Sequence, residues 1–237
     1  MAAIATPVVA HPPRGVSLLR RSLSRFLAWH PEWWVYVVAG AAWVALAWWS
    51  WTPVGHWLLM VPAMMLPVVA HHVRAVGLRS VWSRRHRSTF VFVLAYLAAW
   101  SSVGAGVVLA LVALGVGHHG SHLLPVALLL AAAWQVSVPR RRVVRRCAPL
   151  RLGAASGLAA DRDCAVAGVR SAGRCMVECW PVMLAMVLSH SFLLMAGLTV
   201  VLLTERARGA NPQRRGGRPL EAWVLAGFAA ASVVVLV

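Results

Sequence analysis

Long apolar runs separated by short arginine-rich segments make up most of the chain, and each run predicts an α-helix that crosses a lipid bilayer. A spanning helix needs about 20 consecutive, largely apolar residues. The second run contains Pro62 and Pro67, so we expect a kinked or broken helix there. The pattern predicts an all-α, polytopic membrane helical bundle of about six transmembrane helices, with five as the alternative. The predicted helices cover approximately residues 33–51, 54–70, 89–116, 123–138, 175–203 and 220–237.

The composition agrees with an integral membrane protein. Of the 237 residues, 60% are hydrophobic and 12% are charged, whereas soluble domains are about half apolar and a quarter charged. The formal net charge of +17 would indicate nucleic-acid binding on a soluble chain. Here the basic residues lie between apolar runs, so we expect the lipid bilayer, and no nucleic acid, as a partner.

The positions of the arginines predict the orientation of the chain. They cluster before the first apolar run, between the second and third, and between the fourth and fifth. Because cytoplasmic loops carry an excess of basic residues, we expect a multi-pass membrane protein with a cytoplasmic N-terminus. A basic tail would cover residues 1–30, and a single helical membrane domain would cover 31–237, with a basic cytoplasmic loop at about 139–174.

One group of arginines disagrees with this orientation. The arginines within residues 206–218 would fall outside the cell if the fifth apolar run crossed the membrane once. Either this loop is an exception to the rule, or the fifth run bends back near Ser189–Ser191.

Side chains that bind soft metal ions follow one face of the fifth run. At 100° per residue, five of them fall within an arc of about 80°: Cys175, Cys179, Met183, Met186 and His190. Thiolate and thioether groups select Cu(I), while zinc is possible at the thiolates and imidazole suits either ion. Methionine and cysteine are also common in apolar cores, so simple packing is the alternative interpretation.

The second apolar run carries a similar stripe. Four side chains share an arc of about 80°: His56, Met60, Met64 and His71. The predicted orientation makes the two helices antiparallel. If they pack side by side, His71 would face Cys175, the two methionines would face residues 179–186, and the remaining two histidines would face each other. Such a ladder of soft donors predicts a copper site between the two helices.

Two motifs resemble those of a poorly characterised bacterial family. They are "AMMLP" at residues 63–67 and the run formed by Cys175, Cys179, Trp180 and Met183. The family comprises predicted metal-binding integral membrane proteins, some of them labelled copper chaperones, and the similarity covers about residues 57–205. The resemblance implies metal handling. Family members often carry a further cysteine where this chain has Glu178, and a second cysteine shortly after the position of Cys147, and these departures shift weight to thioethers and histidines.

Together with the resemblance, these observations predict a protein of the bacterial inner (cytoplasmic) membrane that binds Cu(I) and passes it on or across the membrane, with another membrane or copper-handling protein as its partner. One alternative is a haem-binding cytochrome that uses His56, His71 or His72, and His190 as axial ligands. Another is a non-catalytic assembly subunit in which both stripes are core. We do not expect an enzyme, because the sequence contains no nucleophile–base pair and no phosphate-binding glycine loop.

Overall fold

The chain folds as an α-helical bundle. The computed structural model describes residues 22, 26, 29–48, 52–115, 123–138, 140, 153–154, 156–189, 191–209, 224, 226–228 and 230, and these residues contain helices and no strand. The all-α prediction is therefore confirmed. The helices are α2 (Trp33–Trp48), α3 (Pro53–Arg79), the short 3₁₀ helix η1 (Trp82–Arg84), α4 (Arg85–Ala113), α5 (Leu124–Val136), α7 (Gly157–Ser189) and α8 (Phe192–Gly209).

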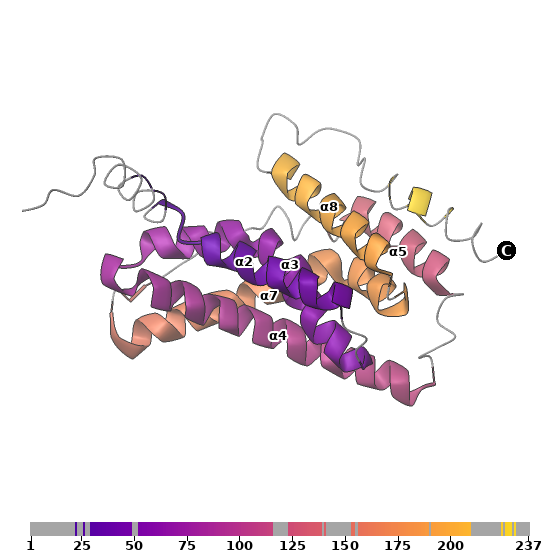
Figure 1. Cartoon of the computed structure of the whole chain (residues 1–237), viewed down its shortest axis with the longest axis horizontal. Coiled ribbons are helices and arrows are strands. Elements are labelled where there is room, and N and C mark those ends of the chain that lie inside the picture. The colour runs from indigo at the N-terminus through magenta and orange to yellow at the C-terminus, as the bar shows by residue number, and fades with distance from the viewer. Residues whose placement is uncertain are drawn as a thin grey trace, which may run out of the picture.

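Helix α4 is the central contact of the bundle. It packs along both α3 and α7, while α2 covers α3 and α5 covers α7. Helix α8 contacts both α3 and α7, and Figure 1 shows the resulting arrangement of long helices with shorter helices against them. Helices α3 and α7, which carry the two predicted stripes of metal-binding residues, therefore both pack against α4. They contact each other mainly through long side chains.

Three of the helices are long and apolar enough to cross a membrane. These segments are Val54–Arg79, Trp82–Ala113 and Gly157–Leu188. Three shorter apolar helices accompany them, at Trp33–Trp48, Leu124–Val136 and Phe192–Thr204. The lengths are consistent with membrane association, and the predicted number of crossings remains a prediction.

The prolines of α3 do not break the helix, which continues from Pro53 to Arg79 through both Pro62 and Pro67. A proline has no N–H, so the carbonyl four residues earlier loses its helical partner. For Pro67 this carbonyl belongs to Ala63, and it accepts a hydrogen bond of 3.0 Å from the indole Nε1 of Trp43 on α2. The covering helix thus replaces the bond that Pro67 removes.

The same arrangement recurs in α7. Pro181 lies inside this helix, and the carbonyl four residues earlier belongs to Val177. That oxygen accepts a hydrogen bond of 2.9 Å from the Nε1 of Trp134 on α5. Tryptophans of the two covering helices therefore satisfy both carbonyls, in addition to the interfacial role that tryptophan has in membrane proteins.

The fifth apolar run is divided into two helices. Helix α7 ends at Ser189 and α8 begins at Phe192, where the Ser191 hydroxyl accepts a hydrogen bond from the N–H of Leu194 at 3.4 Å. Figure 1 shows α8 turning back from the end of α7. Of the two alternatives for this run, the structure has the bend. Helix α7 also starts earlier than expected, so residues 157–174 of the predicted loop are helical.

A glycine allows α4 and α7 to approach closely. A Cβ atom at Gly168 of α7 would collide with the main-chain oxygen of Phe92 on α4. Beyond this contact, toward the start of α7, Asp161 forms ion pairs with Arg84 at 2.5 Å and with Arg87 at 2.6 Å. Ion pairs thus hold the beginning of α7 against the beginning of α4.

Candidate metal centre

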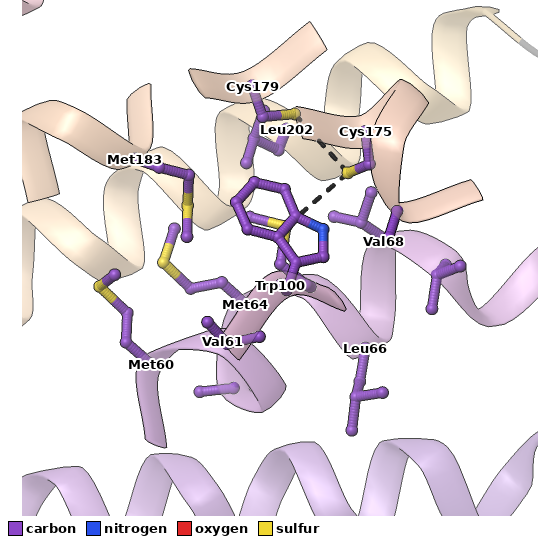
Figure 2. Packing of buried hydrophobic residues seen from close by; sticks show 14 of the residues in the cluster. Met60, Val61, Met64, Leu66, Val68, Trp100, Cys175, Cys179, Met183 and Leu202 are labelled. Carbon is purple, nitrogen blue, oxygen red and sulfur yellow. Dashed lines mark hydrogen bonds between the residues drawn. The ribbon is translucent and has the colours of Figure 1, made fainter. Parts of the chain in front are cut away.

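Six sulfur-containing side chains from two helices gather in the interior of the bundle. All are at most 4% exposed, and Figure 2 shows five of them, labelled, in the space between the two helices. We call this group the sulfur cluster. It consists of Met60, Met64 and Met65 from α3 and Cys175, Cys179 and Met183 from α7.

The thiol of Cys175 is at the centre of the measured contacts. Its Sγ lies 3.9 Å from the Sδ of Met65 and 4.0 Å from the Sγ of Cys179, and both contacts are drawn in Figure 2. The two cysteines are free thiols. Because a thiol has one hydrogen, it can donate to only one of these neighbours at a time. The Cys175 sulfur is thus close to two other sulfurs without being bonded to either.

The helical repeat explains the α7 half of the cluster. Cys175, Cys179 and Met183 follow one another at intervals of four residues, which places them on one face of a helix. On α3, by contrast, Met64 and Met65 are neighbours in sequence and are both fully buried. Two adjacent residues point about 100° apart, so α3 is covered by other helices over more than one face.

Aromatic side chains form a further side of the cluster. Tyr96 and Trp100 are four residues apart on α4, Trp57 comes from α3, and all three are at most 4% exposed. The Tyr96 hydroxyl lies close enough to Cys175 and Cys179 to interact with both electrostatically. Figure 2 shows the Trp100 indole among the sulfur-bearing side chains.

Most of the predicted sulfur ligands lie together in the core. The predicted histidines, by contrast, differ from one another in how deeply they are buried. Met186 is also buried, in the same hydrophobic core. His56 is half-buried and His71 is exposed. The Nδ1 of His71 lies 3.1 Å from the carbonyl oxygen of Val68, and its ring packs on that of His72. His190 lies outside the described residues.

The expected order of the ladder therefore needs a correction. His71 was expected opposite Cys175, but the structure places Met65 there. The expectation assumed that a single face of α3 meets α7, and Met65 lies about 100° from Met64 by the helical repeat. The sequence signal that could have identified Met65 is the pair of adjacent methionines in the "AMMLP" motif. Two adjacent apolar residues point in different directions, so they predict a helix that other helices enclose on several sides.

The donor set is dominated by sulfur. Within the described part of the chain, no three His, Cys, Asp or Glu side chains converge in a way that would hold a metal ion. Any metal bound here by Cys175 and Cys179 would therefore complete its coordination with methionine thioethers. Such ligands select soft, monovalent copper.

Comparison with known proteins identifies the family. The family described as "PpoB2: Copper chaperone" matches residues 54–235, a range that includes both halves of the sulfur cluster. The chain belongs to the PpoB2 family of copper chaperones. No curated protein and no solved structure showed significant similarity to it. Membership in the PpoB2 family supports copper handling as the general function, in agreement with the resemblance noted in the sequence.

Proposed function

We propose that the sulfur cluster binds one Cu(I) ion through Cys175, Cys179 and Met65, and that the chain passes this ion to another copper-handling protein. The spacing of the three sulfurs carries the proposal. A metal–sulfur bond of about 2.3 Å places the sulfurs of a trigonal site about 4.0 Å apart, by geometry. The two measured separations from Cys175 are 3.9 Å and 4.0 Å. These two edges of the sulfur triangle thus already have the length that a bound ion requires.

The remaining predicted ligands extend the site in both directions. Met60, Met64 and Met183 are the other members of the sulfur cluster, and Met186 lies further along α7. His56, His71 and His190 would receive or release the ion at the ends of the route. Transfer requires sites that bind strongly enough to accept an ion and weakly enough to release it. A row of thioethers beside one thiolate pair meets this requirement, because thioethers are neutral ligands.

We place the chain in the bacterial inner membrane with its N-terminus in the cytoplasm. The bend between α7 and α8 supports this orientation, because α8 runs back from the end of α7 toward the opposite end of the bundle (Figure 1). Helix α8, whose final residues include Arg206 and Arg208, thus runs toward the end of the bundle where α3 ends and α7 begins. The arginines after the fifth apolar run then agree with the positive-inside rule.

The test is copper binding by the full chain, purified in detergent and titrated anaerobically with Cu(I) against a chromogenic competitor. We expect about one ion per chain, as a single trigonal site of soft ligands requires. The double variant Cys175→Ser, Cys179→Ser should lose this binding. Met65→Leu should weaken it by roughly tenfold or more, since even partners outside the coordination sphere are worth roughly 10- to 100-fold in metal affinity.

Cys164→Ser is the matched control. Cys164 is a buried, free thiol on the same helix, and its replacement should leave copper binding unchanged. A parent protein that binds no Cu(I), or a double variant that binds as the parent does, would overturn the assignment. A visible haem band in the purified protein would favour the cytochrome interpretation, and a preference for zinc over Cu(I) would contradict the thioether-rich site.

A further inference from the structure

An aromatic wall adjoins the sulfur cluster, and none of its side chains is among the proposed copper ligands. Tyr96, Trp57 and Trp100 form this wall, with the ring centroids of the two tryptophans 6.4 Å apart. In Figure 2 the Trp100 indole overlaps the sulfur-bearing side chains in projection, and Tyr96 interacts both with Trp100 and with the two cysteines. Helix α4, which contributes Tyr96 and Trp100, packs along both sulfur-bearing helices. An ion held by the sulfurs would therefore have this wall as a neighbour.

The structure makes room for a large ring in this wall. A Cβ atom at Gly104 of α4 would collide with the indole of Trp57. Glycine in the middle of a helix is unfavourable by comparison with alanine, yet its absent side chain is what admits the ring here. The space beside the cluster is thus fitted to indole rather than to a smaller side chain.

The polar atoms of the wall are poorly satisfied: the Tyr96 hydroxyl interacts with Trp100 and Cys175, but not with the geometry of a good hydrogen bond. Among the described residues, the Nε1 atoms of Trp57 and Trp100 and the hydroxyl of Tyr96 are buried with no hydrogen-bond partner of good geometry. This differs from Trp43 and Trp134, whose indoles bond main-chain oxygens. A buried N–H without a partner is unfavourable. Phenylalanine or leucine would fill such a position without that cost, which favours a contribution of the Trp57 and Trp100 indoles through their rings.

We infer that the indole of Trp100 forms part of the copper site and attracts the bound Cu(I) ion through its π face. This inference rests on the proposed function of the sulfur cluster. The face of an aromatic ring carries partial negative charge, and indole is the most effective aromatic group for a cation within about 6 Å. The attraction is strongest where water is excluded. It adds neither charge nor a donor atom, so it strengthens binding without a further coordinating ligand.

The inference is tested by fluorinating the ring without changing its size. Fluorine withdraws electron density from the ring and weakens its attraction for a cation. The chain is produced in a tryptophan auxotroph with tryptophan, 5-fluorotryptophan or a more highly fluorinated tryptophan, and Cu(I) affinity is measured by competition. We expect affinity to fall stepwise with fluorination, by about 10- to 30-fold over the series, the range for a desolvated cation–π contact.

Two substitutions identify the responsible ring, because fluorination changes every tryptophan in the chain. In Trp100→Phe, Cu(I) affinity should no longer depend on fluorination. In Trp48→Phe, the dependence should remain as in the parent, since Trp48 is 86% exposed at the end of α2. The series in the parent requires no substitution, so it remains informative even if Trp100→Phe does not fold.

The outcomes separate this inference from the proposed function. If the unfluorinated parent binds no Cu(I), the copper site itself is wrong. If the parent binds Cu(I) and its affinity does not change along the fluorinated series, the sulfur site stands and the aromatic contact is overturned. A dependence that persists in Trp100→Phe would assign the contact to another ring and would also overturn the role of Trp100.

Discussion

Two buried cysteines on one face of α7 have different surroundings. Cys164 and Cys175 are each 3% exposed, and 11 residues, about three helical turns, separate them. Cys175 contacts the sulfur atoms of Met65 and Cys179. Cys164 borders a cavity of about 160 Å³ together with Arg79, Ser80 and Ser88, among others. Burial alone therefore does not indicate a metal ligand, and what distinguishes the two thiols is which side chains the neighbouring helices present.

The polar contacts around the two cysteines differ as well. Near Cys164, charged groups hold the helices together, with Asp161 between Arg84 and Arg87. Near Cys175, two long-range hydrogen bonds end on main-chain oxygens, from the Trp134 indole to Val177 and from the Arg140 guanidinium to Glu178. The comparison suggests that the charged end of α7 serves mainly stability, and that the sulfur cluster serves mainly copper. Substitutions in each region test this division.

Gly168 lies between the two regions, and its substitution is expected to disrupt both. In Gly168→Ala the new Cβ would meet the main-chain oxygen of Phe92, which cannot move without shifting α4. We expect a loss of stability of about 3 kcal/mol, at the upper end of the usual overpacking effects, and reduced copper binding because α4 and α7 separate. The measurement is SDS-induced unfolding in mixed micelles, alongside Cu(I) titration.

Gly173→Ala is the matched control for this prediction. Gly173 lies on the same helix, is exposed, and has nothing within 4 Å of the position of a Cβ. Alanine is the better helix former by about 1 kcal/mol, so this variant should be as stable as the parent or more so. Equal effects of the two substitutions would show that the close approach of α4 and α7 is not what matters at Gly168.

Asp161→Asn is expected to affect stability alone. The substitution removes the charge that pairs with Arg84 and Arg87, and the carboxylate is only 14% exposed. We expect a loss of about 1 to 2 kcal/mol, between the values for exposed and buried ion pairs. The affinity for Cu(I) should stay within twofold of the parent. A large loss of copper affinity in a folded Asp161→Asn protein would contradict the division between the two regions.

The fold was predictable from the sequence wherever hydrophobic pattern decides it. The predicted run at 123–138 corresponds to α5 (Leu124–Val136), and that at 33–51 to α2 (Trp33–Trp48), because length and apolarity are local properties. The continuity of α3 was not predictable in this way. It involves Trp43, a residue 20 positions before Ala63 in the sequence, and helical propensity contains no information about such a partner.

The candidate site was predictable in its residue types and only partly in its geometry. The interval of four residues placed Cys175, Cys179 and Met183 on one face, as the structure has them. The role of Met65 depends on α3 being enclosed by several helices, and the aromatic wall depends on how α4 packs against both α3 and α7. Both are properties of the assembled bundle, so a projection of one helix at a time does not contain them.

The smallest expected effect concerns the hydrogen bond from Trp134 to the Val177 oxygen. This bond lies beside the sulfur cluster, so it tests how the helix is stabilised on the Cys175 side of the comparison. Trp134→Phe removes this donor and should reduce stability by about 1 kcal/mol. Pro181→Ala restores a main-chain N–H that can bond the same oxygen. In the Pro181→Ala background, Trp134→Phe should therefore have almost no effect, and a double-mutant cycle measured by SDS-induced unfolding gives the coupling directly. Additive effects would mean that Trp134 stabilises α7 through its ring contact with Trp180 instead.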